Sequence, residues 1–154
     1  MGERNTLGKL NKNIPDDCKK QIREAAEGNK HYDCVYRVAK WGKIEERAFL
    51  STFEEIQEGY IEDDEMRYPK KEIGTYSTSV YTQRKNCDKY IRLLKRKLRL
   101  REMYPYPVVV QGKTSNGMVQ KTVERDEGYL DDTHVDWWIY NDRKSVVLKD
   151  FSIV

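Results

Sequence analysis

The hydrophobic pattern of the chain is strongest between residues 82 and 103. Apolar side chains recur there at steps of three and four residues, which places them on one face of a helix. These positions are Cys87, Tyr90, Ile91, Leu94 and Leu98. Thr82 is a suitable helix cap, and Tyr104-Pro105 ends the pattern. We therefore expect one long helix with a buried apolar face.

Shorter segments rich in β-branched and aromatic residues predict strands. They cover residues 33–41, 75–81, 107–114 and 134–140. Asn116-Gly117 is a strong hairpin signal, so residues 118–124 are expected to return antiparallel to the strand before them. Residues 145–154 fit either a last strand or a short helix.

Two more helices precede the long one. Residues 15–27 begin with Pro15 and two aspartates, which favour the first turn of a helix. Residues 45–57 carry an apolar stripe that predicts a second helix. Alternatively, residues 49–52 end a strand and the helix starts at Thr52, with Glu55 completing a capping box.

The order of these elements predicts an α+β fold with a largely antiparallel sheet. Helices 15–27 and 82–103 are expected to back the sheet. Residues 1–14 show no period and are expected to form a flexible N-terminus. Residues 15–154 are expected to form a single domain, because a chain of 154 residues suffices for one core.

Composition narrows the class of protein. No apolar run approaches the roughly 20 residues that span a bilayer, and no signal-peptide core follows Met1. We therefore expect a soluble, cytoplasmic protein without a membrane partner. Cys18, Cys34 and Cys87 lack the spacing of a zinc site, so we expect reduced thiols and no metal.

Charge is segregated along the chain, although the net charge is only +3. The polar face of the helix at 84–101 is almost uniformly cationic, and Arg92, Lys95, Arg96 and Arg99 are its candidate surface for an anionic partner. Between residues 54 and 65 every charged residue is acidic. Either this acidic segment neutralises the helix, which we favour, or an acidic protein or nucleic acid binds there.

Several residues could build a ligand site. Arg37 lies in an apolar strand, where it can pack its stem or bind an anion. The hydroxyls of Ser77, Thr78 and Ser79 can serve ordinary strand alternation or bind a ribose or phosphate. His134 and Asp136 share one face of their strand and could form an acid/base pair, although a surface pair is the commoner case.

Two of these motifs resemble the ADP-ribosyltransferase fold: Tyr36-Arg37 on one strand, and the Ser77-Thr78-Ser79 strand that runs into a helix. The resemblance implies that the arginine and the Ser-Thr-Ser strand hold NAD, and that a glutamate on a later strand directs transfer. The chain departs from the family pattern there, because it has no Glu-x-Glu or Gln-x-Glu pair. Glu124, Glu127 and Asp136 are the available substitutes.

These patterns lead to two functional hypotheses. In the first, Arg37, Ser77, Ser79 and the strand of His134 and Asp136 form a cleft for a nucleotide-type ligand. Its specific form is transfer of ADP-ribose from NAD. In the second, the chain is a non-catalytic interaction protein of bacterial or phage type that acts through its charge-segregated surface.

Overall fold

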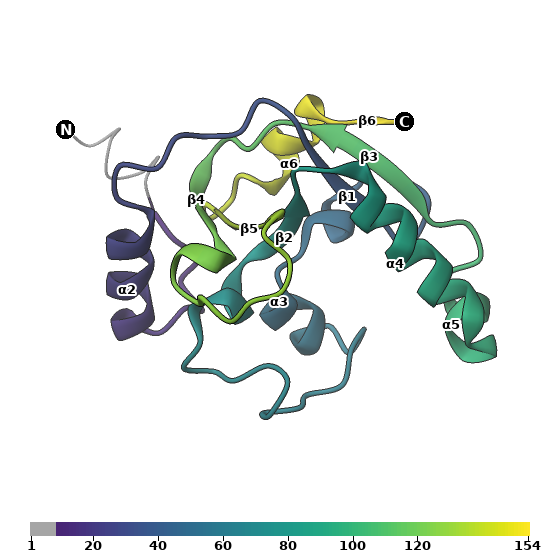
Figure 1. The fold of residues 1–154 in the computed structure, drawn as a ribbon. Helices are drawn as coiled ribbons and strands as arrows, with labels where there is room; N and C mark the ends of the chain where they lie inside the picture. The colour runs from purple at the N-terminus through teal and green to yellow at the C-terminus, as the bar shows by residue number, and fades with distance from the viewer. Residues whose placement is uncertain (1–8) are drawn as a thin grey trace.

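The computed structural model describes residues 9–154, and its centre is a six-stranded antiparallel sheet (Figure 1). The strand order is β4-β5-β2-β1-β3-β6. The strands are β1 (Val35–Ala39), β2 (Thr78–Tyr81), β3 (Val108–Gly112), β4 (Gly117–Lys121), β5 (His134–Ile139) and β6 (Ser152–Ile153). The predicted α+β class with a largely antiparallel sheet is confirmed.

Helices lie at both sides of this sheet (Figure 1). The α-helices are α2 (Asp16–Ala26), α3 (Thr52–Gln57), α4 (Arg84–Arg96), α5 (Leu98–Met103) and α6 (Lys144–Val147). Four 3-10 helices join them: η1 (Glu46–Phe49), η2 (Ile73–Tyr76), η3 (Thr122–Glu124) and η4 (Leu148–Asp150). The apolar face of α2 packs with Trp138, and that of α4 packs with Val38 and Val109.

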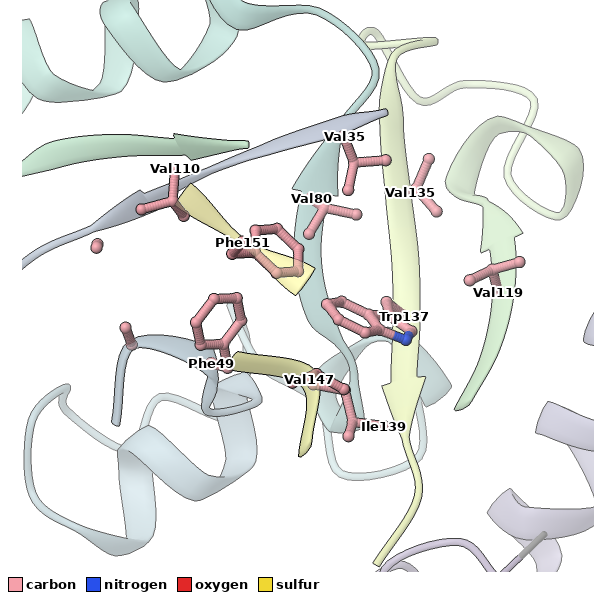
Figure 2. Packing of buried hydrophobic residues seen from close by; sticks show 12 residues of the cluster. Val35, Phe49, Val80, Val110, Val119, Val135, Trp137, Ile139, Val147 and Phe151 are labelled. Carbon is pink, nitrogen blue, oxygen red and sulfur yellow. The ribbon is translucent and has the colours of Figure 1, made fainter. Parts of the chain in front are cut away.

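The largest apolar cluster fills the space between the sheet and the C-terminal segment (Figure 2). Val80 and Trp137 come from the central strands, while Phe49 and Phe151 come from the chain that covers them. The Phe49 and Phe151 rings have centroids 4.8 Å apart, and Phe151 stacks on Trp137 at 5.8 Å. Because the protein has few Leu and Ile side chains, these large rings supply much of the apolar burial.

The long helix is interrupted at Lys97, whose backbone is extended with φ −97° and ψ 126°. The sequence predicted a single helix over 82–103, and this prediction is wrong at the break. One non-helical residue changes the rotational phase of the helix that follows. As a result Leu98, expected on the buried face, is 60% exposed, and Leu100 packs on the core instead.

The predicted hairpin at Asn116-Gly117 is wrong. Asn116 does adopt a positive φ of 49°, as a tight turn requires. However, β3 pairs with β1 and β6, whereas β4 pairs with β5. Turn residues show only that the chain changes direction locally. Which strands pair depends on burial, and β4 places Val119 in the same apolar cluster as Trp137 of β5.

Around Thr52 the structure agrees with the second of the two interpretations, in which residues 49–51 precede the helix. The helix starts at Thr52, but Ser51 is its cap. The Ser51 hydroxyl accepts from the Glu54 amide at 3.1 Å, and Glu54 accepts from the Ser51 amide at 2.9 Å. Glu54 therefore completes the capping box expected of Glu55, and Glu55 is free to turn inward.

Two other boundaries also differ from expectation. Residues 73–76 form η2, so the strand predicted over 75–81 begins only at Thr78. The C-terminal segment contains both of its expected alternatives, because α6 is followed by the short strand β6.

The segment 9–14 belongs to the packed domain, unlike the flexible N-terminus expected over 1–14. Leu10 and Ile14 are buried against Trp138, with exposed fractions of 3% and 6%. The Asn141 amide also donates to the Lys9 carbonyl at 2.8 Å. Residues 1–8 lie outside the described residues, so that part of the expectation stays a prediction.

None of the helices within residues 9–154 combines the length and apolar character that crossing a bilayer requires.

Replacing Leu94 with Ala should destabilise the protein by about 2–5 kcal/mol, because Leu94 is 3% exposed and its removal leaves a cavity. The neighbouring Leu93, 45% exposed, is the matched control, and Leu93→Ala should cost less than about 0.5 kcal/mol. Urea unfolding monitored by tryptophan fluorescence measures both. Equal losses for the two variants would contradict the packing of α4 described above.

Candidate functional site

A cleft lies beside strands β1, β2 and β5. It consists of two adjoining hollows that share Thr52, Tyr68 and Ser79 in their walls. The smaller hollow has a volume of about 240 Å³ and the larger one about 540 Å³. Charged side chains of both signs and several aromatic rings line the cleft, which is the composition of a site for a polar, ring-containing ligand.

Arg37 on β1 holds the floor of the smaller hollow together. Its Nε donates to the Ala48 carbonyl at 2.6 Å, its Nη1 to the Ser79 carbonyl at 2.7 Å and its Nη2 to the Leu50 carbonyl at 3.2 Å. The guanidinium thereby ties the backbone before α3 to β2. The guanidinium nitrogens thus donate to backbone oxygens, and these bonds hold the cleft in place.

Lys40 and Glu55 form a buried ion pair next to Arg37. Lys40 Nζ lies 2.7 Å from one Glu55 oxygen, and Arg37 Nη2 lies 3.7 Å from the other. Burial alone would lower the pKa of the Lys40 ammonium, but the Glu55 carboxylate and the Tyr90 hydroxyl raise it overall. Lys40 therefore stays cationic in the cleft. The sequence offered no signal for this pair, because the two residues meet only in the fold.

The Ser77-Thr78-Ser79 hydroxyls have three different environments. The Ser77 hydroxyl lies 2.6 Å from Asp136 Oδ1, and the Thr78 hydroxyl donates to the Phe49 carbonyl at 2.8 Å. Thr78 therefore does not line the cleft. Within residues 9–154 the Ser79 hydroxyl makes no hydrogen bond, and Ser79 lines both hollows. Of the three hydroxyls, that of Ser79 is the one available to a ligand.

Asp136 on β5 is the centre of a polar network in the wall of the larger hollow. Only 2% exposed, it is the strand partner of Ser79. Its Oδ2 accepts from the Thr122 hydroxyl at 2.9 Å and lies 2.7 Å from Arg125 Nη2. This pairing satisfies a buried carboxylate that would otherwise be costly to desolvate.

Arg125 carries the network from Asp136 to the mouth of the cleft. Its guanidinium also binds Glu72 Oε1 at 2.8 Å and Gln120 Oε1 at 2.9 Å. Its position in a polar loop gave no sequence signal of this role, and η3 brings it to the site.

His134 is buried between two tyrosine rings. The centroids of Tyr81 and Tyr129 lie 5.3 Å and 5.4 Å from that of the imidazole. Its Nδ1 is hydrogen-bonded to the Thr122 hydroxyl. Burial lowers the pKa of His134 below its ordinary value, so the imidazole is uncharged near neutral pH.

The structure gathers some of the predicted residues and separates others. Arg37, Ser77, Ser79, His134 and Asp136 line the cleft together. Glu124, on η3, and Glu127 are exposed and line neither hollow. Of the three acids considered as the directing carboxylate, the fold thus brings Asp136 alone to the cleft.

The acidic segment 54–65 does not neutralise the basic helix, which corrects the pairing that the sequence favoured. Glu54 pairs with Lys144 at 2.8 Å and Glu55 pairs with Lys40. Asp63 and Glu65 both bind Lys70, at 2.6 Å and 3.1 Å. These acids thus pair with cations outside the basic helix, and Ile61 of the same segment lines the smaller hollow.

Two further observations complete the site. Within residues 9–154, no three His, Cys, Asp or Glu side chains gather as metal ligands. Comparison of the chain with protein-family models, curated proteins and solved structures finds no match.

Acidification should destabilise the protein through His134. Since its folded pKa is lowered, the unfolded state binds more protons between that value and about 6.5, and stability falls as the pH decreases through this window. Urea unfolding at about pH 7.5 and 5.5 should show a loss that is smaller in His134→Gln. The exposed His31→Gln is the control. An NMR titration of His134 with a midpoint at or above about 6.5 would refute the assignment.

Asp136 and Glu72 both bind the Arg125 guanidinium, but their removal should change the free energy of unfolding by very different amounts. Asp136→Asn leaves Arg125 without its buried partner and should cost about 3 kcal/mol of unfolding free energy. Glu72 binds the same Nη2 but its side chain is 51% exposed, so Glu72→Gln should cost less than about 1 kcal/mol. Chemical denaturation of both variants measures the difference, and a larger loss for Glu72→Gln would contradict the network.

Proposed function

We propose that the cleft binds a nucleotide-type ligand, that this ligand is NAD, and that the protein transfers ADP-ribose from it. The observation that carries the proposal is the order of three neighbouring strands. β1 bears Arg37, β2 bears Thr78 and Ser79 directly after Ser77, and β5 bears His134 and Asp136, and all three strands border one cleft. The resemblance to ADP-ribosyltransferases implies a strand arginine, a Ser-Thr-Ser strand and a later acid in this role.

The walls of the cleft suit the parts of a dinucleotide. The free hydroxyl of Ser79 can bond to a ribose. Lys40 and Arg125 place cationic groups at the two hollows. Both are paired with carboxylates, so a phosphate would share Lys40 with Glu55 and Arg125 with Glu72 and Asp136. The rings of Tyr81 and Tyr129 flank His134 and offer flat surfaces against which a base can stack.

Asp136 is the acid that we assign to the transfer step. When the bond between nicotinamide and the ribose C1′ breaks, the bonding electrons leave with nicotinamide and positive charge develops on the ribose. A carboxylate beside the ring stabilises that charge. The acceptor then bonds to C1′ and gives up a proton, which the uncharged imidazole of His134 can take.

In this proposal Arg37 acts as a positioning residue. Its bonds to the Ala48, Leu50 and Ser79 carbonyls fix β2 relative to α3, and so fix the position of the Ser79 hydroxyl. Preorganised groups contribute most to binding and catalysis because they need not reorient when the ligand arrives.

Incubation of the purified protein and a cell lysate with labelled NAD tests transfer, and a thermal shift with unlabelled NAD tests binding. NAD at about one hundred times its Kd should stabilise the fold by about 2.7 kcal/mol, or roughly 5–10 °C in Tm. Ser79→Ala should weaken NAD binding about fivefold, since one hydrogen bond is worth about 1 kcal/mol. Ser145→Ala, an exposed serine on α6, is the matched control.

The outcomes separate binding from transfer. A thermal shift without label transfer would leave a nucleotide-binding protein and remove the transferase. Absence of both would remove the proposed function. A shift that Ser79→Ala and Ser145→Ala alter equally would place the NAD elsewhere on the protein.

A further inference from the structure

The solvent side of α4 and α5 is a dense cationic surface, which we call the basic face. It consists of Arg84, Lys85, Lys89, Arg92, Lys95, Arg96, Lys97, Arg99 and Arg101, all of them exposed. Within residues 9–154, Arg84 pairs with Asp88 at 3.6 Å, and the other cations of this face make no ion pair. Like charges at helix spacing repel one another, so this arrangement costs stability unless a partner offsets it.

Apart from Asp88, residues 9–154 supply no ion-pair partner for the basic face. The acids of residues 54–65 that make ion pairs do so with Arg37, Lys40, Lys70 and Lys144. Glu102 is the one carboxylate of α5 and is itself exposed. The charge of the basic face is thus directed toward solvent.

The face is also held rigidly. The apolar side of α4 packs through Cys87 and Leu94 on Val38 of β1 and Val109 of β3. Figure 1 shows α4 and α5 in succession along the outside of the sheet. At about 1.5 Å per residue, the thirteen residues of α4 extend over about 20 Å. An array of cations at fixed positions loses little conformational freedom on binding.

From this surface we infer that the protein binds double-stranded nucleic acid through its phosphate backbone, independently of the cleft and of the proposed transferase activity. A duplex presents about one negative charge per 1.7 Å of its axis, so the six cations of α4, spread over about 20 Å, meet enough phosphates for every cation to find a partner. We expect the cations to contact phosphates and to make no contacts that distinguish one base from another.

Two other anionic partners fit the basic face less well. A helix that lies in a membrane surface inserts an apolar face, but the apolar face of α4 is occupied by the sheet, and exposed Leu93 and Leu98 stand among cations. Single-strand binding surfaces add aromatic platforms for the bases. Tyr90 is the one aromatic residue of 84–103, and it packs against the core.

Fluorescence anisotropy with a labelled DNA duplex of about 20 base pairs tests the inference at about 50 and 200 mM salt. We expect micromolar binding at the lower concentration. If about four phosphates are neutralised, the affinity should fall roughly a hundredfold at the higher one. The quadruple variant Arg92→Gln, Lys95→Gln, Arg96→Gln, Arg99→Gln should lose this binding while retaining its circular dichroism spectrum.

The matched control removes four cations from and around α2 instead. Lys12→Gln, Lys20→Gln, Arg23→Gln, Lys30→Gln lowers the net charge equally at exposed positions, and should bind the duplex within about threefold of the original affinity. Equal losses in both variants would show attraction by net charge alone and overturn the inference. Failure to bind at the lower salt concentration would also overturn it. So would tighter binding to phosphatidylserine vesicles or to the matching single strand.

Discussion

The guanidinium of Arg37 is the interaction on which the arrangement of this protein depends. It enters from β1 and donates to carbonyls on both sides, those of Ala48 and Leu50 before α3 and that of Ser79 in β2. Three backbone oxygens near the core thereby accept from a charged donor, which satisfies buried polar groups. The same bonds set the distance between α3 and the central strands, and this gap becomes the smaller hollow of the cleft.

A second buried network closes the other end of the cleft. It too satisfies buried polar groups by hydrogen bonds. Asp136 accepts from Thr122 and pairs with Arg125, so the loop after β4 is fastened to the middle of the sheet. Buried ionic groups persist only when their hydrogen bonds are complete, and such groups fix geometry more than they add net stability. Between the two networks the Ser79 hydroxyl has no hydrogen-bond partner among residues 9–154, and this asymmetry defines the candidate ligand position.

The cleft and the basic face differ in whether their charged side chains are paired within the fold. Around the cleft, cations and anions are paired within the fold: Lys40 with Glu55, Lys70 with Asp63 and Glu65, and Arg125 with Asp136. On α4 and α5, Arg84 pairs with Asp88, and the other cations make no ion pair within the described chain. Screening by salt acts strongly on exposed charges and weakly on buried ones. The two surfaces should therefore respond to ionic strength in different ways, because the charges of one are paired and partly buried and those of the other are exposed.

The sequence by itself determined the fold class, the apolar face of α4 and the strands that carry Arg37, Ser79 and Asp136. Apolar side chains repeat every two residues in a strand and every three to four residues in a helix, so these features can be recognised within a single segment of the sequence. Tertiary structure alone decided that β4 joins β5, that Lys97 interrupts the helix, and that Lys40, Glu55 and Arg125 enter the cleft. It also decided that the acidic segment turns away from the basic helix. Such outcomes depend on contacts between residues far apart in the chain, whose energies are settled by packing and burial after the local patterns are satisfied.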